Sequence, residues 1–537
     1  MPACSDEIRT TCTLDCPDRC VLLCRRSSGG SLEEQGPPAP AAHAQVSSSP
    51  VPTRLTLRGD PDHPFTRGFT CVKIRRYPAR LVSAERITQP HVRRGFSVGG
   101  GRSPGASSAD FVPVSWDEAM ELVVDALREA LADDPASVLL LRGAGSMGAS
   151  KLFADWLFAA LGARRTKGSL CNVAGVEAIV RDCGRLDMND PAQIDQAEAI
   201  VLWGKHPRAC SVHTASQVQR ARMRGIPVLA VNPDRGAVAN LADHLISVRP
   251  GTDRFLALAV TKLFLEQTTR PVPWDQAANV AAYERLLDSW FVDDLLSTCQ
   301  VSRDNANALA ELYVRTPRVA TICGWGLQRY DTGGESVRAI DALCFLAGTM
   351  GVSGGGLYYC IPSRRHLSLP RLAPGPEPLS LPLLVSELER AVPAVSFAWI
   401  AGLNYLNQTM EAPRARAAFA SIPTVVAVDG YWTDTVLAST VVLPPALFLE
   451  EDDVVGSYWR NELYAVHRVA APPAGCRTDF DILQGLAARL GLDVPWRRLD
   501  DWLDSLLPES VGGLERLRAQ SWCRRAGSRP VPGSSRR

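Results

Sequence analysis

Short apolar runs alternate with helical patterns through most of the chain, and this alternation restricts the possible folds most strongly. The runs that we expect to be buried strands lie at 138–141, 199–203, 226–231, 245–248, 318–322, 395–400 and 424–428. The segments with helical spacing lie at 116–131, 149–161, 213–224, 253–266 and 335–350. Strands that alternate with helices form mostly parallel sheets, so the sequence predicts a doubly wound α/β fold.

Three cysteines at regular short spacing, Cys12, Cys16 and Cys20, mark the N-terminal segment. A proline and acidic residues between them disfavour helix and strand, so we expect a loop that wraps a metal centre. Cys71 offers a fourth thiolate, and four thiolates suit the four irons of a [4Fe–4S] cluster. A structural zinc site and unrelated free thiols are the alternatives. Cys24 continues the spacing and competes with Cys71 for the fourth position.

The composition is that of an ordinary globular protein. The chain has 537 residues, of which 46% are hydrophobic and 21% charged, and its net charge is +1. No bulk charge points to nucleic acid or to a membrane surface. We find no signal sequence and no apolar segment long enough to span a bilayer. The fifteen cysteines therefore indicate metal binding in a reducing cytoplasm better than a disulfide framework.

Glycine, Asn-Pro or Asp-Gly follows nearly every predicted strand. These positions include Gly143, Gly204, Asn232, Gly324, Gly402 and Asp429. Ligands of open α/β sheets bind outside the carboxyl ends of the strands, where glycines let the backbone approach a phosphate. So many loops of this kind predict one large phosphorylated ligand or two of them.

The loop from Gly143 to Gly148 has the Gly-x-Gly-x-x-Gly spacing of an NAD site. About twenty residues later, however, residues 164–167 read Arg-Arg-Thr-Lys where an acidic residue should bind the ribose. We therefore regard NAD as a weak alternative.

An ordered set of motifs resembles the molybdopterin oxidoreductases, the family built around bis(molybdopterin guanine dinucleotide) that includes formate dehydrogenases and dimethyl sulfoxide reductases. After the cysteine loop come Gly-Asp-Pro-Asp-His-Pro, Gly-Phe-Thr-Cys-Val-Lys, Pro-Val-Ser-Trp-Asp-Glu-Ala, Arg-Pro-Gly-Thr-Asp, Gly-Trp-Gly-Leu-Gln-Arg and Asp-Gly-Tyr-Trp-Thr. The likeness covers about residues 10–490 in the order of the family.

This resemblance implies roles for individual residues. Cys12, Cys16, Cys20 and Cys71 would hold the [4Fe–4S] cluster, and Lys73 would lie between the cluster and the pterin. Asp253 would accept hydrogen bonds from a guanine. The remaining residues implied to bind the two dinucleotides are Gly204, Asn232, Gly324, Gly326, Gln328, Asn404 and Asp429.

The resemblance also implies a protein ligand to molybdenum or tungsten. Cys171, in Gly-Ser-Leu-Cys-Asn-Val-Ala-Gly, lies at the corresponding place, and its soft thiolate suits the metal. A buried free cysteine is the alternative, and Cys183 and Cys210 are the next candidate ligands. Asn172 follows Cys171, where formate dehydrogenases characteristically have His, and this weakens formate as the substrate.

Two further departures from the family motifs are local. His206 stands where the family often has Asn, and Tyr405 where it often has Pro.

The predicted domain organisation follows the family. We expect a small N-terminal [4Fe–4S] domain at 1–84 with a flexible insertion at 27–52. A discontinuous α/β domain would comprise 85–136 and 345–500, and a Rossmann-like domain at 137–344 would be inserted into it. Residues 501–537 would form a short tail, because the β-rich domain that normally closes the family is absent from the sequence.

The leading hypothesis is a molybdenum- or tungsten-dependent oxidoreductase, formate dehydrogenase-like, acting on a small substrate. Its electrons would leave through the cluster to a partner protein of iron–sulfur, flavin or ferredoxin type. Either a separate chain would supply the closing domain, or the chain would be a truncated, impaired copy of the family. The alternatives are a non-catalytic electron-transfer or scaffold subunit without the pterin, and a nucleotide-binding α/β protein with a zinc site.

Overall fold

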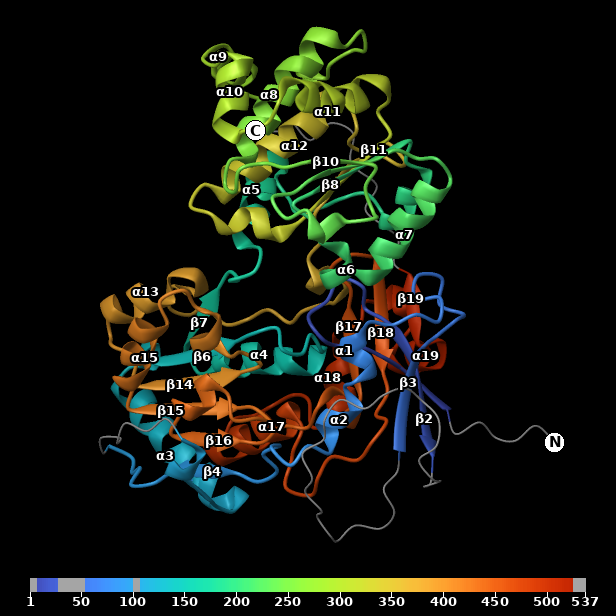
Figure 1. Cartoon of the computed structure of the whole chain (residues 1–537). Coiled ribbons are helices and arrows are strands. Elements are labelled where there is room, and N and C mark those ends of the chain that lie inside the picture. Colours follow the sequence, from blue (N-terminus) through green and yellow to red (C-terminus); the bar gives the residue numbers. More distant parts are fainter. Residues whose placement is uncertain (1–6, 28–53, 100–106, 525–537) are drawn as a thin grey trace, which may run out of the picture.

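The computed structural model describes residues 7–27, 54–99 and 107–524, which form four sheets and the helices around them (Figure 1). Apart from its first residue, the insertion predicted at 27–52 lies outside the described residues. Within these ranges, no helix combines the length and the apolar character needed to cross a bilayer.

An eight-stranded sheet forms the lower body in Figure 1. Its strands lie in the order β13 (Leu379–Ser380), β7 (Arg164–Lys167), β6 (Val138–Arg142), β14 (Phe397–Ala401), β15 (Thr424–Val428), β16 (Val441–Leu443), β4 (His91–Arg93) and β5 (Phe111–Pro113). The first six strands are parallel, and β4 and β5 add an antiparallel edge. In chain order the parallel strands read 3-2-1-4-5-6, the order of dinucleotide-binding sheets, so the topological switch point lies between β6 and β14.

Alternating side chains of these strands face two cores, which is why the sequence shows continuous apolar runs. Leu140 of β6 packs toward α3 (Trp116–Asp133), α4 (Phe153–Ala160) and α17 (Asp479–Leu490). Leu139 and Leu141 face α13 (Leu384–Arg390) and α15 (Ala412–Ala420) on the other side. The sheet is therefore covered on both faces, as predicted for a doubly wound fold.

A five-stranded parallel sheet forms the upper body. Its order is β10 (His244–Ile246), β9 (Val228–Val231), β8 (Ala199–Trp203), β11 (Val319–Cys323) and β12 (Gly356–Tyr358). The chain order 3-2-1-4-5 places its switch point between β8 and β11. The helices of this body are α5 (Val173–Cys183), α6 (Pro207–Cys210), α7 (Val212–Met223), α8 (Asp253–Gln267), α9 (Val280–Asp288), α10 (Val292–Cys299), α11 (Arg303–Arg315) and α12 (Gly333–Leu346).

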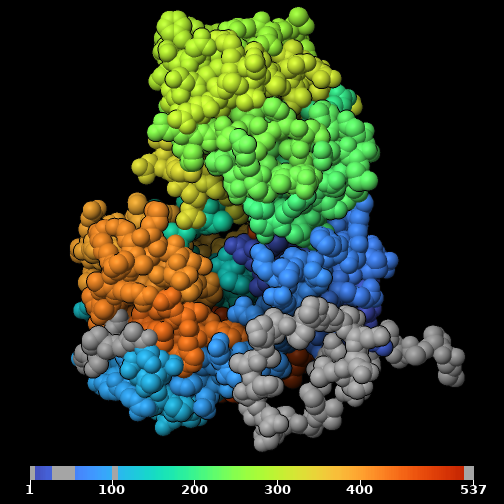
Figure 2. All heavy atoms as spheres, viewed as in Figure 1, coloured from blue at the N-terminus to red at the C-terminus, as the bar shows by residue number. Residues whose placement is uncertain are grey.

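Two small antiparallel sheets pack together beside these bodies. One contains β1 (Glu7–Thr11), β2 (Val21–Ser27) and β3 (Arg54–Gly59), and the other β17 (Asp453–Gly456), β18 (Glu462–Val466) and β19 (Trp522–Arg524). They share one core, to which Leu22 and Tyr464 belong. Figure 2 shows a hollow in the surface where the blue N-terminal region, the green upper body and the orange lower body meet. The remaining short helices are α1 (Val72–Arg75), α2 (Pro78–Leu81), α14 (Tyr405–Gln408), α16 (Asp434–Leu437), α18 (Leu499–Ser505) and α19 (Leu514–Gln520).

The strand pairing departs from the predicted domain boundaries in two places. β6 pairs with both β14 and β7 in the eight-stranded sheet, although residue 137 was expected to open the inserted unit. The described part of the expected tail, 501–524, contains α19 and β19, and β19 pairs with β18. An alternation of strands and helices does not reveal which sheet a strand joins, because strand pairing is nonlocal.

Candidate functional site

The loop that carries the first three cysteines connects β1 to β2, and the amide of Cys12 donates a 2.9 Å hydrogen bond to the carbonyl of Cys20. Burial raises the pKa of Cys12 to about 11. Burial, together with nearby Cys12, Cys16 and Cys71, raises the pKa of Cys20. The structure thus brings these four thiols together, whereas Cys24 lies within β2. No three His, Cys, Asp or Glu side chains in the described ranges are arranged to hold a single metal ion.

A buried hydrogen-bond network connects the upper body to the loop of residues 12–20, which is called the thiol loop below. Asp18 accepts hydrogen bonds from Nδ1 of His213 at 2.9 Å and from the hydroxyl of Ser211 at 2.8 Å. Although burial alone would raise it, these hydrogen bonds bring the pKa of Asp18 below its ordinary value. Nε2 of His213 also lies 2.9 Å from the carbonyl oxygen of Phe69, two residues before Cys71. His213 therefore contacts both the loop that carries Cys12, Cys16 and Cys20 and the segment that precedes Cys71.

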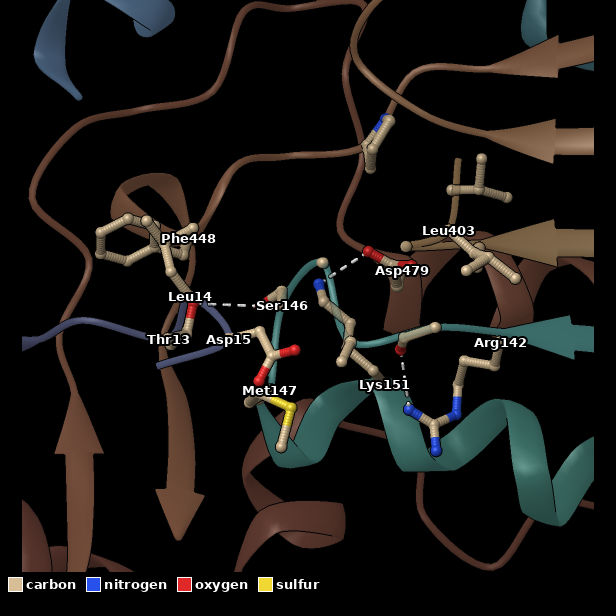
Figure 3. A pocket seen from close by; sticks show the side chains of 18 of the residues that line it. Thr13, Leu14, Asp15, Arg142, Ser146, Met147, Lys151, Leu403, Phe448 and Asp479 are labelled. Atoms are coloured by element: carbon tan, nitrogen blue, oxygen red, sulfur yellow. Dashed lines mark hydrogen bonds and ion pairs between the residues drawn. The ribbon is translucent and has the colours of Figure 1, made fainter. Parts of the chain in front are cut away.

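A cavity of about 800 Å³ lies at the switch point of the eight-stranded sheet. It is lined by the loops that follow β6, β14 and β15, and on another side by Thr13, Leu14 and Asp15 of the thiol loop. Figure 3 shows Thr13 facing Ser146, and their hydroxyl oxygens are 3.0 Å apart. The thiol loop therefore forms one wall of the cavity.

Glycine is required in the loop after β6 because other loops pass very close to it. A Cβ atom at Gly143 would lie 2.4 Å from the carbonyl oxygen of Gly402, and one at Gly145 would lie 2.8 Å from the same oxygen. A Cβ atom at Gly148 would lie 1.8 Å from a carboxylate oxygen of Asp453. These glycines thus bring the loops after β6 and β14 together at the cavity.

A buried cluster of charges forms part of the cavity wall. The ammonium of Lys151 lies 2.6 Å from Glu451 and 2.7 Å from Asp479, and all three residues line the cavity. Asp453, beside them, accepts hydrogen bonds from the amide and hydroxyl of Ser150. Burial raises the pKa of Glu451 to about 8. The sequence did not reveal this cluster, because its members come from three separate elements and form no local motif.

Cys171 lies on the cavity wall, whereas Cys183 and Cys210 are outside the set of residues that line it. Burial raises the pKa of Cys171 to about 11. The side-chain amide of Gln328 donates a 2.6 Å hydrogen bond to the carbonyl of Cys171 and accepts one of 3.2 Å from the amide of Gly175. Gln328, expected to line a dinucleotide path, thus also holds the loop of the candidate ligand.

Of the other predicted residues, Asn404 and Asp429 line the same cavity. The side-chain oxygen of Asn404 accepts a 2.9 Å hydrogen bond from the hydroxyl of Thr435. Burial raises the pKa of Asp429 to about 6. Both residues shape the loops after β14 and β15. The Lys73 side chain is exposed on α1, and it is not among the residues that line the cavity.

The second group of predicted residues lies at the carboxyl edge of the five-stranded sheet. The members of this group are Gly204 after β8, Asn232 after β9, Asp253 at the start of α8, and Gly324 and Gly326 after β11. Asp253 is buried and accepts a 2.9 Å hydrogen bond from the indole of Trp203. The structure therefore separates the predicted site residues into two sets, one at each switch point.

The cavity fits a large anionic cofactor. Its wall presents the glycine-rich backbone of residues 143–148 together with the cationic side chains of Arg80, Arg142 and Arg329. Backbone amides and cations of this kind bind pyrophosphate groups. Arg142 is paired with Asp155 at 3.0 Å, so its guanidinium has a fixed position at the end of β6. Two dinucleotide-type sheets around such a cavity define a class of α/β proteins that bind a large nucleotide-type cofactor.

Comparison with known proteins identifies the family within this class. Residues 86–489 match the family model of the molybdopterin oxidoreductases, and the chain belongs to this family. Membership implies a molybdenum- or tungsten-pterin cofactor and oxidoreductase chemistry. The resemblance inferred from the sequence motifs is thereby confirmed.

The chain shares at most 29% sequence identity with each of the relatives named here. The chain is 29% identical to the probable oxidoreductase YyaE of Bacillus subtilis (strain 168), over 86% of this chain and 69% of that protein. It is 22% identical to formate dehydrogenase H of Escherichia coli (strain K12), over 73% of this chain and 60% of that one. The fold is similar to that of the acetylene hydratase from Pelobacter acetylenicus, with a TM-score of 0.77 and 15% identity over 96% of this chain and 74% of that chain.

Proposed function

We propose that this chain is a molybdenum- or tungsten-dependent oxidoreductase that exchanges two electrons with a small substrate. Cys12, Cys16, Cys20 and Cys71 would hold a [4Fe–4S] cluster, which would supply one-electron transfer. The observation that carries this proposal is the shared wall between the thiol loop and the cavity at the switch point. Thr13 and Ser146 are in contact there, so a cofactor in the cavity and a cluster in the loop would be close neighbours.

The residues of the cavity have distinct roles in this proposal. The bound pterin metal would supply the two-electron chemistry, and Cys171 would be its protein ligand. The loops at 143–148 and 402–404 would bind one dinucleotide, with Asn404 and Asp429 on that side. The residues at the five-stranded switch point would hold the second dinucleotide, and Asp253 would bind its guanine.

The electron acceptor is a partner protein of iron–sulfur, flavin or ferredoxin type, and the protein works in the cytoplasm. Relatives such as YyaE are longer than the matched part of this chain, which covers 69% of that protein.

The test is metal and cofactor analysis of the protein purified without oxygen and produced with its genomic neighbours. We expect about four irons and acid-labile sulfides per chain, with molybdenum or tungsten and a guanine nucleotide. Cys171→Ser should keep the iron and lose one sulfur neighbour of the heavy metal in X-ray absorption. Four irons without heavy metal or pterin would refute the catalytic proposal and favour an electron-transfer subunit.

A further inference from the structure

Arg19 lies within the thiol loop, and its backbone adopts a conformation that is unfavourable for a residue with a side chain. Its φ is +43°, in the left-handed region where non-glycine residues are uncommon. It is nevertheless only 1% exposed, because its guanidinium turns inward. Nη1 donates hydrogen bonds to the carbonyls of Cys12 at 3.1 Å and Leu14 at 2.9 Å. The side chain therefore lies between a candidate cluster ligand and the wall of the cavity.

Arg19 has no carboxylate in direct contact among the described residues, and the charge of Asp15 acts on it only from a longer distance. The Nε and Nη2 atoms of Arg19 are buried without a hydrogen-bond partner there, and no carboxylate oxygen of those residues forms an ion pair with it within 4.0 Å. Asp18, one residue earlier, is engaged by His213 and Ser211. The ring of Tyr458, centred 5.9 Å from the guanidinium carbon, is a weak substitute. A buried cation without a carboxylate in direct contact is costly.

Arg460, which is also buried near this loop, shows the usual solution. Its Nε atom lies 2.6 Å from Glu462 and its Nη2 atom donates to the hydroxyl of Tyr464 at 2.5 Å. The two neighbouring buried guanidinium groups therefore differ in their surroundings. Arg460 has a carboxylate partner, whereas the loop of Arg19 has four thiols around it.

We propose that Arg19 is the counter-cation of the metal–thiolate centre and that it raises the reduction potential of the [4Fe–4S] cluster. This inference rests on the proposed function, which supplies the cluster. A [4Fe–4S] centre with four thiolates carries a net charge of about −2 when oxidised and gains one electron on reduction. A fixed positive charge stabilises the more negative, reduced form more strongly. The buried N–H groups of Arg19, which lack a partner among the described residues, would then face an anionic centre.

The test is a potentiometric titration of the full chain, followed by electron paramagnetic resonance of the reduced cluster. Arg19→Gln should shift the midpoint potential to more negative values, and Arg19→Lys should stay close to the wild type. Arg19→Gly removes the charge and also suits the positive φ, so its negative shift cannot be attributed to loss of folding.

Arg67→Gln is the matched control. Arg67 also has a positive φ, of +49°, and belongs to the same N-terminal region, but its side chain is exposed. We expect its midpoint potential to equal that of the wild type. Unchanged potentials in Arg19→Gln and Arg19→Gly, with iron content intact, would overturn the role of Arg19 and leave the proposed function standing. Protein that binds zinc instead of iron, or no metal at all, would overturn both.

Discussion

Lys151 is surrounded by more negative groups than it can neutralise. Glu451, Asp453 and Asp479 form one buried group around a single ammonium. One oxygen of Glu451, Oε2, is buried without a hydrogen-bond partner among the described residues. Three ionised carboxylates beside one cation would leave a net negative charge in a poorly hydrated site, which is unfavourable. The cluster therefore keeps a proton on Glu451, whose pKa burial raises from 4.5 to about 8.

This retained proton predicts a pH dependence of stability. The folded state binds one more proton than the unfolded state between the two pKa values of Glu451. Stability should therefore be highest below about pH 4.5, as far as this group is concerned, and fall as the pH rises through about 8. Glu451→Gln should flatten the decrease in melting temperature from about pH 6 to about pH 9. Asp452→Asn, a neighbour that accepts a hydrogen bond from the amide of Arg468 instead, should retain the wild-type slope. An equal slope in all three proteins would contradict this assignment.

At the scale of the elements, the loops after β8 and β11 cross at the switch point of the five-stranded sheet. The amide of Gly324 donates a 2.7 Å hydrogen bond to the carbonyl of Trp203. A Cβ atom at Gly324 would lie 1.9 Å from the carbonyl oxygen of Gly204, which no real contact permits. Gly326, two residues later, has nothing within 4 Å of its Cβ position. Only the first of these two glycines is required by the protein's own packing.

Substitutions at these two glycines should therefore have different effects, one on stability and the other on ligand binding. Gly324→Ala should force the two loops apart and lower the melting temperature, with a cost of about 1–3 kcal/mol for the strained contact. Gly326→Ala should leave the melting temperature unchanged and lower the guanine nucleotide content, because the proposed cofactor passes close to this backbone. Thermal unfolding measures the stability of the two variants, and nucleotide analysis measures their guanine nucleotide content. A destabilised Gly326→Ala protein with normal nucleotide content would refute the role of Gly326.

At the scale of the whole molecule, local patterns predicted elements well and their partners poorly. The buried runs at 138–141 and 395–400 correspond to β6 and β14, and Ser115 and Glu118 cap α3 at the predicted position. The motifs also pointed to the loops at both switch points, and Cys171 lies on the wall of the cavity, although its role as a metal ligand stays a prediction. The sheet to which β6 belongs and the charge cluster at Lys151 depend on segments about 300 residues apart. No local periodicity carries that information.

The segment at 499–524 shows how such nonlocal packing stabilises the molecule. Trp502 is fully buried, and its indole donates a 3.1 Å hydrogen bond to the carbonyl of Ala149, next to the glycine loop. Its ring packs against Phe153 and Trp496, at centroid distances of 5.4 and 4.7 Å. A segment expected to be a tail thus supports the helix that begins behind the cavity.

Trp502→Ala should consequently destabilise the protein by about 3–5 kcal/mol, because a large buried ring leaves a cavity and the carbonyl of Ala149 loses its donor. Phe291→Ala is the control, since that aromatic side chain is 80% exposed and its loss should change stability by less than about 0.5 kcal/mol. Denaturant unfolding of both variants measures the difference. Equal midpoints would show that the C-terminal segment is not held to the core as the contacts of Trp502 indicate. A large loss for Trp502→Ala alone would place residues 499–524 within the cooperative unit that forms the cavity.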